Sequence, residues 1–280
     1  MAAVFATVES PPLSSDIVLE THALTRRFGD LVAVEGVTLQ VEAAQIFGLL
    51  GSNGAGKTTM IKILTTLLPP SSGTATVAGF DIQRQAARVR RAIGYVPQMI
   101  SADGNLTGYE NLLIFAKLYD VPRRERTSLI ADALALMGLE DAGGRLVREY
   151  SGGMIRRLEI AQSMLHRPQV LFLDEPTVGL DPIARNSVWE RLRQLVTDFK
   201  TTVFLTTHEM EEADALCHQI AILHRGALAI AGSPSALKAS LGKEGATLDD
   251  VFVRYAGTLI ESGGTYRDAS RTRRTARRVG

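Results

Sequence analysis

One nine-residue stretch, GSNGAGKTT, has the residue types and spacing of a phosphate-binding loop, and it begins at Gly51. It matches the pattern G-x-x-x-x-G-K-[ST], whose glycines let the loop curl until backbone N–H groups face a phosphate. In that chemistry Lys57 neutralises the β- and γ-phosphates of a nucleotide, and the Thr58 hydroxyl ligates Mg²⁺. An apolar segment, QIFGLL, precedes the loop and a helix-like segment, TTMIKILTTLL, follows it, as this mechanism requires. The predicted binding loop consists of Gly51, Ser52, Asn53, Gly54, Ala55, Gly56, Lys57, Thr58 and Thr59.

A pair of carboxylates ends another apolar segment, VLFLDEP, which begins at Val170. A buried strand there would deliver Asp174 at its end, where the carboxylate can hold Mg²⁺ through water. Because side chains alternate along a strand, Glu175 is expected to point to the other side and to be free for general-base chemistry. An Asp-Glu pair alone is more typical of a solvated loop, but the phosphate loop in the same chain favours the metal-site interpretation.

Two polar side chains follow other short apolar segments. His208 ends VFLTTH, where it could contact a γ-phosphate, and Gln98 follows IGYVP, where it could orient an attacking water or ligate the metal. A lone histidine after a strand is more often structural, and a lone glutamine indicates little. Both assignments therefore depend on the presence of the phosphate loop.

A second candidate anion site lies in EYSGGMIRRLEIA, which begins at Glu149. Ser151 has the residue type of a helix N-cap, and apolar residues recur at helical spacing after it. Gly152 and Gly153 would let an anion lie close to backbone N–H groups at the helix N-terminus. One chain therefore carries two predicted anion sites that are far apart in sequence.

The segments around these motifs predict an α/β fold. Strand-like and helix-like segments alternate, which favours a mainly parallel sheet flanked by helices. Two alternating segments, IVLETHAL from Ile17 and VTLQV from Val37, predict half-buried antiparallel strands, and ATVAGFDI predicts a further strand. QIAILHRGALAIAG predicts a late hairpin. From residue 98 to residue 167 the periodicity is helical, which indicates an insertion into the sheet domain.

Prolines and N-cap residues predict several helix boundaries. Pro69 and Pro70 are expected to end the helix after the phosphate loop. Ser233 and Pro234 predict the start of a C-terminal helix, and Thr247 in TLDDVF is a weaker start signal for another. We expect an N-terminal tail (1–16), a sheet domain (17–232) with its helical insertion (about 98–167), a helical extension (233–266) and a basic tail (267–280).

The composition is that of an ordinary globular protein. The chain has 280 residues, is 45% hydrophobic and 22% charged, and carries a formal net charge of +1, so no global field argues for nucleic acid or a membrane surface. A single cysteine excludes an intrachain disulfide and fits a reducing compartment. The basic tail is expected to be solvated and disordered, with contact to lipid or nucleic acid as the alternative.

The N-terminal segment lacks the features of a signal peptide, because it has neither a positively charged start nor a long apolar core. No apolar run approaches the roughly 18 residues of a membrane span. If the protein works at a membrane, another chain is expected to span it.

These motifs, in this order, resemble those of the ATP-binding cassette (ABC) ATPases. The resemblance covers about residues 17–232 and rests on GSNGAGKTT (Walker A), YVPQ (Q-loop), YSGGM (signature), VLFLDEP (Walker B), GLD (D-loop) and TTH (H-loop). YSGGM before LFLDEP is the specific feature, since other phosphate-loop enzymes lack it. The resemblance implies a P-loop NTPase core of ABC type, with an antiparallel β subdomain and a helical insertion, and it implies ATP and Mg²⁺ as cofactors.

The resemblance also implies residue roles. Phe28 takes the place where an aromatic ring, often tyrosine, stacks on adenine, Glu175 would be the general base, and His208 would contact the γ-phosphate. Asp174, Thr58 and Gln98 would hold Mg²⁺. Two departures occur in the signature, where Met154 stands in place of a common glutamine and Tyr150 in place of leucine. Met154 follows the glycines, so we expect it to pack and not to disturb the backbone N–H groups.

The family further implies a head-to-tail dimer, formed with a second copy of the chain or with a paralogous cassette. The phosphate loop of one subunit would face Ser151, Gly152 and Gly153 of the other, and Asp181 would couple the two. This arrangement would explain the second anion site, which would serve the γ-phosphate bound by the partner.

Softer features place the chain in a branch of the family. GNLTGYENLLIFAKLYDVP, YSGGMIRRLEIA and ATLDDVFVRYAG look like the drug- and antibiotic-exporter branch, similar to daunorubicin-resistance cassettes. The implied protein is a peripheral ATPase subunit on the cytoplasmic face of the cell membrane, working with separate ABC-2-type membrane permease subunits. The alternatives are a soluble ABC ATPase acting on ribosomes or DNA, and a nucleotide-gated binding module that does not hydrolyse ATP. The first usually has two cassettes or a coiled-coil insertion, and Glu175 and His208 argue against the second.

Overall fold

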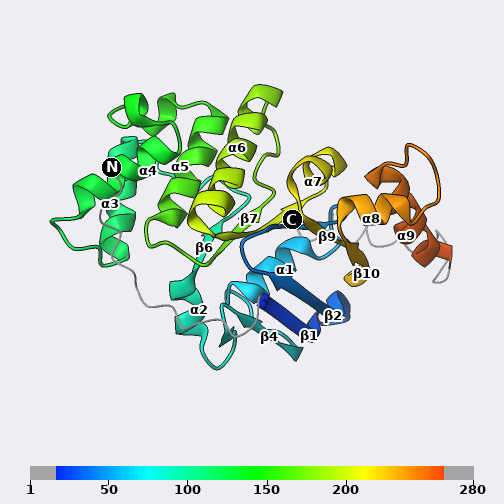
Figure 1. Cartoon of the computed structure of the whole chain (residues 1–280). Helices are drawn as coiled ribbons and strands as arrows, with labels where there is room; N and C mark the ends of the chain where they lie inside the picture. Colours follow the sequence, from blue (N-terminus) through cyan, green and yellow to red (C-terminus); the bar gives the residue numbers. More distant parts are fainter. Residues whose placement is uncertain (1–16, 262–280) are drawn as a thin grey trace, which may run out of the picture.

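The structure, a computed structural model, describes residues 17–261 of the chain, and side chains within residues 17–256. In Figure 1 the green helices from the middle of the chain lie at one end, the blue antiparallel strands lie below the central sheet, and the orange C-terminal helices lie at the other end. The predicted tails, 1–16 and 267–280, lie outside the described residues, as do residues 262–266 of the predicted helical extension.

A six-stranded sheet forms the centre of the described chain, in the order β10-β9-β3-β8-β7-β6. Neighbouring strands are parallel except for β9 and β10, which form the predicted late hairpin. The mainly parallel sheet expected from the sequence is therefore confirmed. The strands are β3 (Ile46–Leu50), β6 (Ile93–Val96), β7 (Val170–Asp174), β8 (Thr202–Thr207), β9 (Gln219–His224) and β10 (Ala227–Gly232).

The parallel register brings the carboxyl ends of four strands to one edge of this sheet. Leu50 at the end of β3 pairs with Thr207 at the end of β8, and Asp174 at the end of β7 pairs with Thr206. The phosphate loop follows β3, and the other three predicted polar motifs follow β6, β7 and β8. Ligands of open α/β sheets bind outside this edge, so the fold brings together motifs that are far apart in sequence.

Apolar side chains fix the sheet from both of its faces. Phe47, Phe172 and Phe204 pack with α1 (Lys57–Leu64) and the second sheet. The ring centroid of Phe204 lies 5.3 Å from that of Phe47 and 5.4 Å from that of Phe172. The adjacent Leu171 and Leu205 belong to the core on the opposite face, under the helical region. Each fully buried side chain of this size contributes about 1.5–3 kcal/mol, so the edge that carries the motifs is held firmly.

A second, antiparallel sheet of four strands lies beside α1, in the order β2-β1-β4-β5. Its strands are β1 (Ile17–Phe28), β2 (Leu31–Glu42), β4 (Ser72–Val77) and β5 (Phe80–Asp81). The prediction of one continuous strand for ATVAGFDI was wrong, because Ala78 and Gly79 both have positive φ values, 52° and 78°, and form a turn. A glycine adopts this conformation without strain, so the chain reverses there.

One predicted helix boundary needs correction, and two further helices were not predicted. Helix α1 ends at Leu64, before Pro69 and Pro70, because Thr66 has a left-handed conformation (φ 63°) and the next amides fold back onto the carbonyl of Lys62. Two helices are not indicated by the sequence, α2 (Ala86–Ala92) and α7 (Met210–Leu216). Each has seven residues, about two turns, which is too short for a helical period to stand out.

The region from 98 to 167 is helical, as predicted. It contains α3 (Gly108–Leu118), α4 (Arg126–Leu136), two short 3₁₀ segments, η1 (Glu140–Ala142) and η2 (Val147–Glu149), and α5 (Gly152–Met164). Helix α5 packs against α3 and α4, and also against α6 (Pro182–Phe199), which follows β7. It therefore joins the helical region to the sheet domain.

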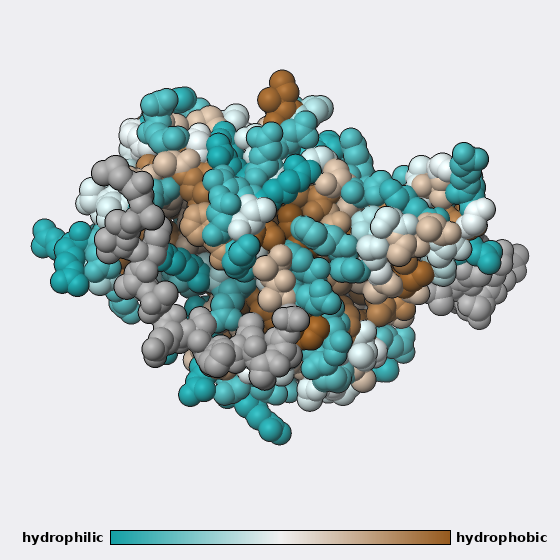
Figure 2. Space-filling view, viewed as in Figure 1, coloured by the Kyte–Doolittle hydropathy of each residue, from teal (hydrophilic) through white to brown (hydrophobic). Residues whose placement is uncertain are grey.

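The C-terminal helices begin where the N-cap residues predicted. Ser233 accepts a hydrogen bond from the amide of Ala236 at the start of α8 (Pro234–Ala239). Thr247 and Asp250 bond reciprocally at the start of α9 (Leu248–Glu261). Within residues 17–261, no helix has both the length and the apolar character needed to cross a membrane. Figure 2 shows hydrophilic residues over most of one face, with small apolar patches between the helices, as is usual for a globular surface.

Candidate functional site

The phosphate loop connects β3 to α1, and two of its glycines allow a close approach of the backbone. Gly56 has a φ of 107°, and a Cβ there would lie 2.3 Å from the carbonyl oxygen of Ala33. A Cβ on Gly51 would lie 2.5 Å from the carbonyl oxygen of Leu223. Side chains are therefore excluded at both positions, and the loop can curl tightly against its neighbours.

A cleft of about 610 Å³ opens over this loop, within the size range of small-molecule sites. It brings together Phe28, most of the predicted loop, Gln98 and Glu175. The ring of Phe28 is 43% exposed at the end of β1, and the guanidinium carbon of Arg26 lies 4.5 Å from its centroid. An exposed ring at the cleft can stack on a nucleobase. The lining residues are Phe28, Leu31, Val32, Ala33, Asn53, Gly54, Ala55, Gly56, Lys57, Thr58, Thr59, Gln98, Glu175 and Arg225.

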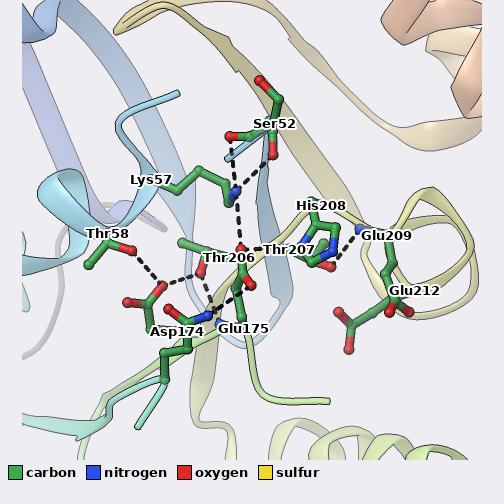
Figure 3. A network of polar contacts seen from close by, with 12 residues as sticks. Ser52, Lys57, Thr58, Asp174, Glu175, Thr206, Thr207, His208, Glu209 and Glu212 are labelled. Atoms are coloured by element: carbon green, nitrogen blue, oxygen red, sulfur yellow. Dashed lines mark hydrogen bonds and ion pairs between the residues drawn. The ribbon is translucent and has the colours of Figure 1, made fainter. Parts of the chain in front are cut away.

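Lys57 is the buried cation of the cleft. Its Nζ donates to the carbonyl oxygens of Gly51 at 2.7 Å and Ser52 at 3.3 Å, and it lies 3.2 Å from Glu175 Oε1 (Figure 3). The side chains of Lys57 and Glu175 are only 5% and 7% exposed. A buried charge needs compensation, and here both the loop carbonyls and a carboxylate supply it.

Asp174 lies at the end of β7 and faces two hydroxyl groups (Figure 3). Its Oδ1 accepts hydrogen bonds from Thr206 Oγ1 at 2.6 Å and Thr58 Oγ1 at 3.3 Å. Burial and the Asp174 charge raise the pKa of the adjacent Tyr95 to about 12. The sequence reasoning missed Thr206, because only the pairing of β7 with β8 places it opposite Asp174.

The groups near Asp174 fit a magnesium ion. Thr58 Oγ1 lies at the carboxylate of Asp174, and Gln98 lines the same cleft as Thr58. Their hydroxyl, carboxylate and amide oxygens are hard ligands of the kind that Mg²⁺ prefers. The described residues include no cluster of three His, Cys, Asp or Glu side chains able to hold a metal. A magnesium ion at this place would therefore need substrate phosphates and water to complete its coordination, as is usual for this ion.

Glu175 points toward Lys57, Gln98 and His208. Gln98 Nε2 lies 3.3 Å from Glu175 Oε2, and His208 Nδ1 lies 3.3 Å from Glu175 Oε1. The two carboxylates do face different partners, but the predicted reason, alternation along a strand, was wrong. Strand β7 ends at Asp174, and Glu175 has a left-handed backbone with a φ of 50°. Its amide donates to the carbonyl oxygen and the hydroxyl of Thr206, which holds this uncommon conformation.

A buried carboxylate behind His208 was also missed by the sequence reasoning. Glu212 on α7 is 1% exposed, and its Oε1 accepts from Thr177 Oγ1 at 2.6 Å and Trp189 Nε1 at 3.0 Å. Burial raises its pKa, while these hydrogen bonds act in the opposite direction. Glu212 therefore ties α7 to α6 and to the segment that follows Glu175. A glutamate four residues after a histidine is too ordinary to be noticed in a sequence.

The second predicted anion site lies outside the cleft. Ser151 is the N-cap of α5, as predicted, and its side chain accepts from the amide of Met154 at 3.3 Å. Met154 is half-buried against the main core, which agrees with the expected packing role. A Cβ on Gly153 would lie 2.7 Å from Ala184 Cβ on α6, so this glycine is needed for helix packing as well as for exposing backbone N–H groups.

Asp181 also lies outside the residues that line the cleft, at the start of α6. Its Oδ1 accepts hydrogen bonds from the amides of Ile183 at 3.0 Å and Ala184 at 2.9 Å, so it is the N-cap of this helix. Ala184 is the residue that faces Gly153. The structure therefore brings Asp181 close to the second anion site, and it brings neither of them to the cleft of the same chain.

The chain is similar to a large group of known proteins. A protein family described as ABC transporter matches residues 34–178. The chain is 47% identical to a daunorubicin/doxorubicin resistance ATP-binding protein, DrrA, of Streptomyces peucetius, over 80% of this chain and 68% of that protein. It is 41% identical to a Nod factor export ATP-binding protein I of Burkholderia thailandensis, over 78% of this chain and 72% of that protein.

Solved structures show the same architecture. One described as the ATP binding subunit of an ABC transporter has a TM-score of 0.75 and 28% sequence identity, and the match covers 85% of this chain and 99% of that one. Another, cbiO1 from Clostridium perfringens, described as part of the ABC transporter complex cbiONQ, has a TM-score of 0.75 and 25% identity, covering 88% of this chain and 100% of that one.

Proposed function

The chain belongs to the ABC transporter family of ATP-binding proteins, and we propose that it is the ATP-hydrolysing subunit of an exporter of drugs, antibiotics or other hydrophobic compounds. It is an ATPase, which converts ATP and water to ADP and phosphate. The observation that carries the proposal is that Lys57, Asp174, Glu175 and His208, which come from three separate segments of the chain, lie together at one sheet edge. Relatives named for daunorubicin resistance and for Nod factor export support the assignment to an exporter.

In the proposed mechanism the loop residues bind the phosphates of ATP through backbone N–H groups, and Lys57 neutralises their charge. Thr58, Asp174 and Gln98 would hold Mg²⁺, which supplies charge stabilisation at the phosphates when bound. Glu175 takes a proton from the attacking water as general base. His208 contacts the γ-phosphate beside it, and Phe28 stacks on the adenine ring.

The second anion site is proposed to act on a partner's nucleotide. Ser151, Gly152, Gly153 and Asp181 lie outside the cleft of their own chain, so a head-to-tail dimer would be needed to use them. At a helix N-terminus the unpaired N–H groups carry partial positive charge, which favours a γ-phosphate there. The partner would be a second copy of this chain or a paralogous cassette.

A solved neighbour is described as part of an ABC transporter complex. We propose that this chain binds separate permease subunits at the cytoplasmic face of the membrane. The proposed domain division keeps residues 17–232 as the ABC ATPase domain, with the helical subdomain at about 98–167 and the C-terminal extension after 232.

One experiment tests the catalytic assignment. Turnover of ATP by the full-length chain should require Mg²⁺, and Glu175→Gln should lower kcat by about 10²–10⁴ while ATP still binds. That variant should also accumulate a dimer in ATP, visible by size-exclusion chromatography. A loss of kcat below about tenfold would refute Glu175 as the base.

A second experiment tests the exporter assignment. Purification of the tagged chain in mild detergent should recover a membrane protein in fixed stoichiometry. Recovery of ribosomes or DNA in its place would instead support a soluble ABC ATPase.

A further inference from the structure

Two oppositely charged side chains on α5, Arg156 and Glu159, are almost completely buried. They are 8% and 2% exposed, and Arg156 Nη1 lies 3.0 Å from Glu159 Oε2. Because they are three positions apart on a helix, they lie on the same face. Arginine and glutamate are seldom buried to this degree unless they are paired, and each still has further polar groups to bind.

Both side chains bind the backbone of the segment that carries Gln98. Arg156 donates from Nη1 to the carbonyl oxygen of Pro97 at 2.8 Å and from Nη2 to that of Gln98 at 3.0 Å. Glu159 Oε1 accepts from the amide of Ser101 at 2.5 Å and from its hydroxyl at 2.9 Å. The pair therefore holds the segment 97–101 at both of its ends.

The same segment reaches the cleft through the side chain of Gln98. Its Nε2 lies 3.3 Å from Glu175 Oε2, although the residue as a whole is exposed. An exposed side chain on a loop has little intrinsic order, so its position depends on what holds the backbone. Among the contacts of the described residues, the carbonyl of Gln98 is held by Arg156.

Helix α5 thus carries two features of the proposed site close together. Its N-terminus at Ser151 is the anion site proposed to act on a partner's nucleotide, and Arg156 lies five residues further on. At about 1.5 Å of rise per residue, this separation is about 7.5 Å along one rigid helix. A displacement of the helix N-terminus would therefore also move the side chains that bind the segment carrying Gln98.

We propose that Arg156 and Glu159 are positioning residues that set the place of Gln98 in the catalytic site according to the position of α5. The inference rests on the proposed function, because it uses the role proposed there for Gln98. Their action is through hydrogen bonds to the backbone of residues 97–101, and neither side chain lines the cleft.

A purely structural role does not explain the pair well. Replacing a buried ion pair by apolar groups is often neutral or stabilising, so stability alone gives little reason for the pair. The adjacent Arg157 provides a matched control, since it donates to the carbonyl oxygens of Met137 at 2.7 Å and Gly138 at 3.1 Å. It has the same residue type, the same helix and two carbonyl acceptors, but it holds the end of α4.

The first test is a double-mutant cycle on ATP hydrolysis by the full-length chain. Arg156→Met should lower kcat about tenfold or more with little change in KM for ATP, since a catalytic group displaced by about 1 Å can cost 10²-fold. Gln98→Ala should then add less than about twofold in the Arg156→Met background, and keep its full effect in the Arg157→Met background. Losses that multiply in both backgrounds, or a Gln98→Ala variant with normal kcat, would overturn the proposal.

The second test needs no nucleotide and stays informative even if the chain hydrolyses no ATP. Hydrogen exchange of the peptide containing Ser101 should be faster by about tenfold in Glu159→Ala, which removes the acceptor of the Ser101 amide, and in Arg156→Met, which releases the carbonyl groups of the same segment. It should be unchanged in Arg157→Met. Glu159→Ala leaves both bonds from Arg156 to the segment in place, so it serves if Arg156→Met fails to fold. Exchange equal to that of the wild type in both folded variants would refute the positioning role.

Discussion

Replacing Glu175 by glutamine is expected to have opposite effects on the nucleotide-free chain and on ATP binding. Lys57 and Glu175 form a charge pair at 3.2 Å with side chains only 5% and 7% exposed. Glutamine keeps the shape of glutamate but removes its charge, so Lys57 loses its anionic partner and is left with neutral acceptors such as the carbonyl oxygens of Gly51 and Ser52. The phosphates of ATP would restore an anionic partner for Lys57.

The geometry gives the size of this effect. Two unit charges at 3.2 Å attract by about 5 kcal/mol at an effective dielectric constant of about 20, before the cost of desolvating both is subtracted. Because two carbonyl acceptors remain on Lys57, we expect a net loss of about 1–3 kcal/mol in the free energy of unfolding. The same free energy should reappear as ATP affinity that is about 5- to 150-fold higher, since binding relieves the unpaired charge.

Thermal unfolding and equilibrium ATP binding measure both halves of this prediction. Without nucleotide, Tm of Glu175→Gln should fall by about 2–12 °C, from the usual 2–4 °C per kcal/mol for a domain of this size. With saturating ATP the difference should shrink or reverse. Glu211→Gln is the control, because Glu211 is 80% exposed and lies 3.4 Å from Arg185, and an exposed pair contributes only about 0–1 kcal/mol. If Tm and the Kd for ATP of Glu175→Gln both equal those of the wild type, the reasoning about Lys57 is refuted.

Three further predictions follow from close contacts in the structure. Gly153→Ala should lower the free energy of unfolding by about 1–3 kcal/mol in urea titrations, because its Cβ would lie 2.7 Å from Ala184 Cβ. Gly152→Ala, whose Cβ would meet only the end of a leucine side chain, should cost less, and equal costs would contradict the packing argument. Thr206→Val should lower it by about 1.5–3 kcal/mol and raise the Mg²⁺ concentration for half-maximal turnover, since a hydroxyl bonded to the metal-site carboxylate is lost; an unchanged Mg²⁺ requirement would count against that site. Burial raises the pKa of Glu212 above its ordinary 4.5, so its contribution to stability is lost as pH rises through the folded-state pKa. The Glu212→Gln variant should therefore gain stability relative to the wild type from pH 4.5 upward, whereas a constant difference across a pH series would show that Glu212 does not titrate this way.

Features built from neighbouring residues could be predicted from the sequence. The phosphate loop, the apolar strands before Asp174 and His208, and the N-cap at Ser151 depend on residue types a few positions apart. The mainly parallel sheet and the helical region followed from the same periodicities. Short elements were less visible, which is why α2, α7 and the turn that separates β4 from β5 were missed.

The contacts that organise the site could not be predicted in this way. Thr206 touches Asp174 because β7 and β8 pair in one particular register, and Arg156 holds Gln98 because α5 packs beside the end of β6. Glu175 owes its direction to a left-handed backbone that Thr206 stabilises, and not to strand alternation.

The sequence by itself therefore determined which chemical groups this protein has and which local segments carry them. The tertiary structure alone decided which groups meet, that two predicted anion sites lie apart in one chain, and which buried side chains hold the reacting ones. The physical reason is that hydrogen bonds and ion pairs act over about 3 Å, whereas partners such as Thr58 and Asp174 are 116 positions apart, so only strand register and helix packing can bring them within reach.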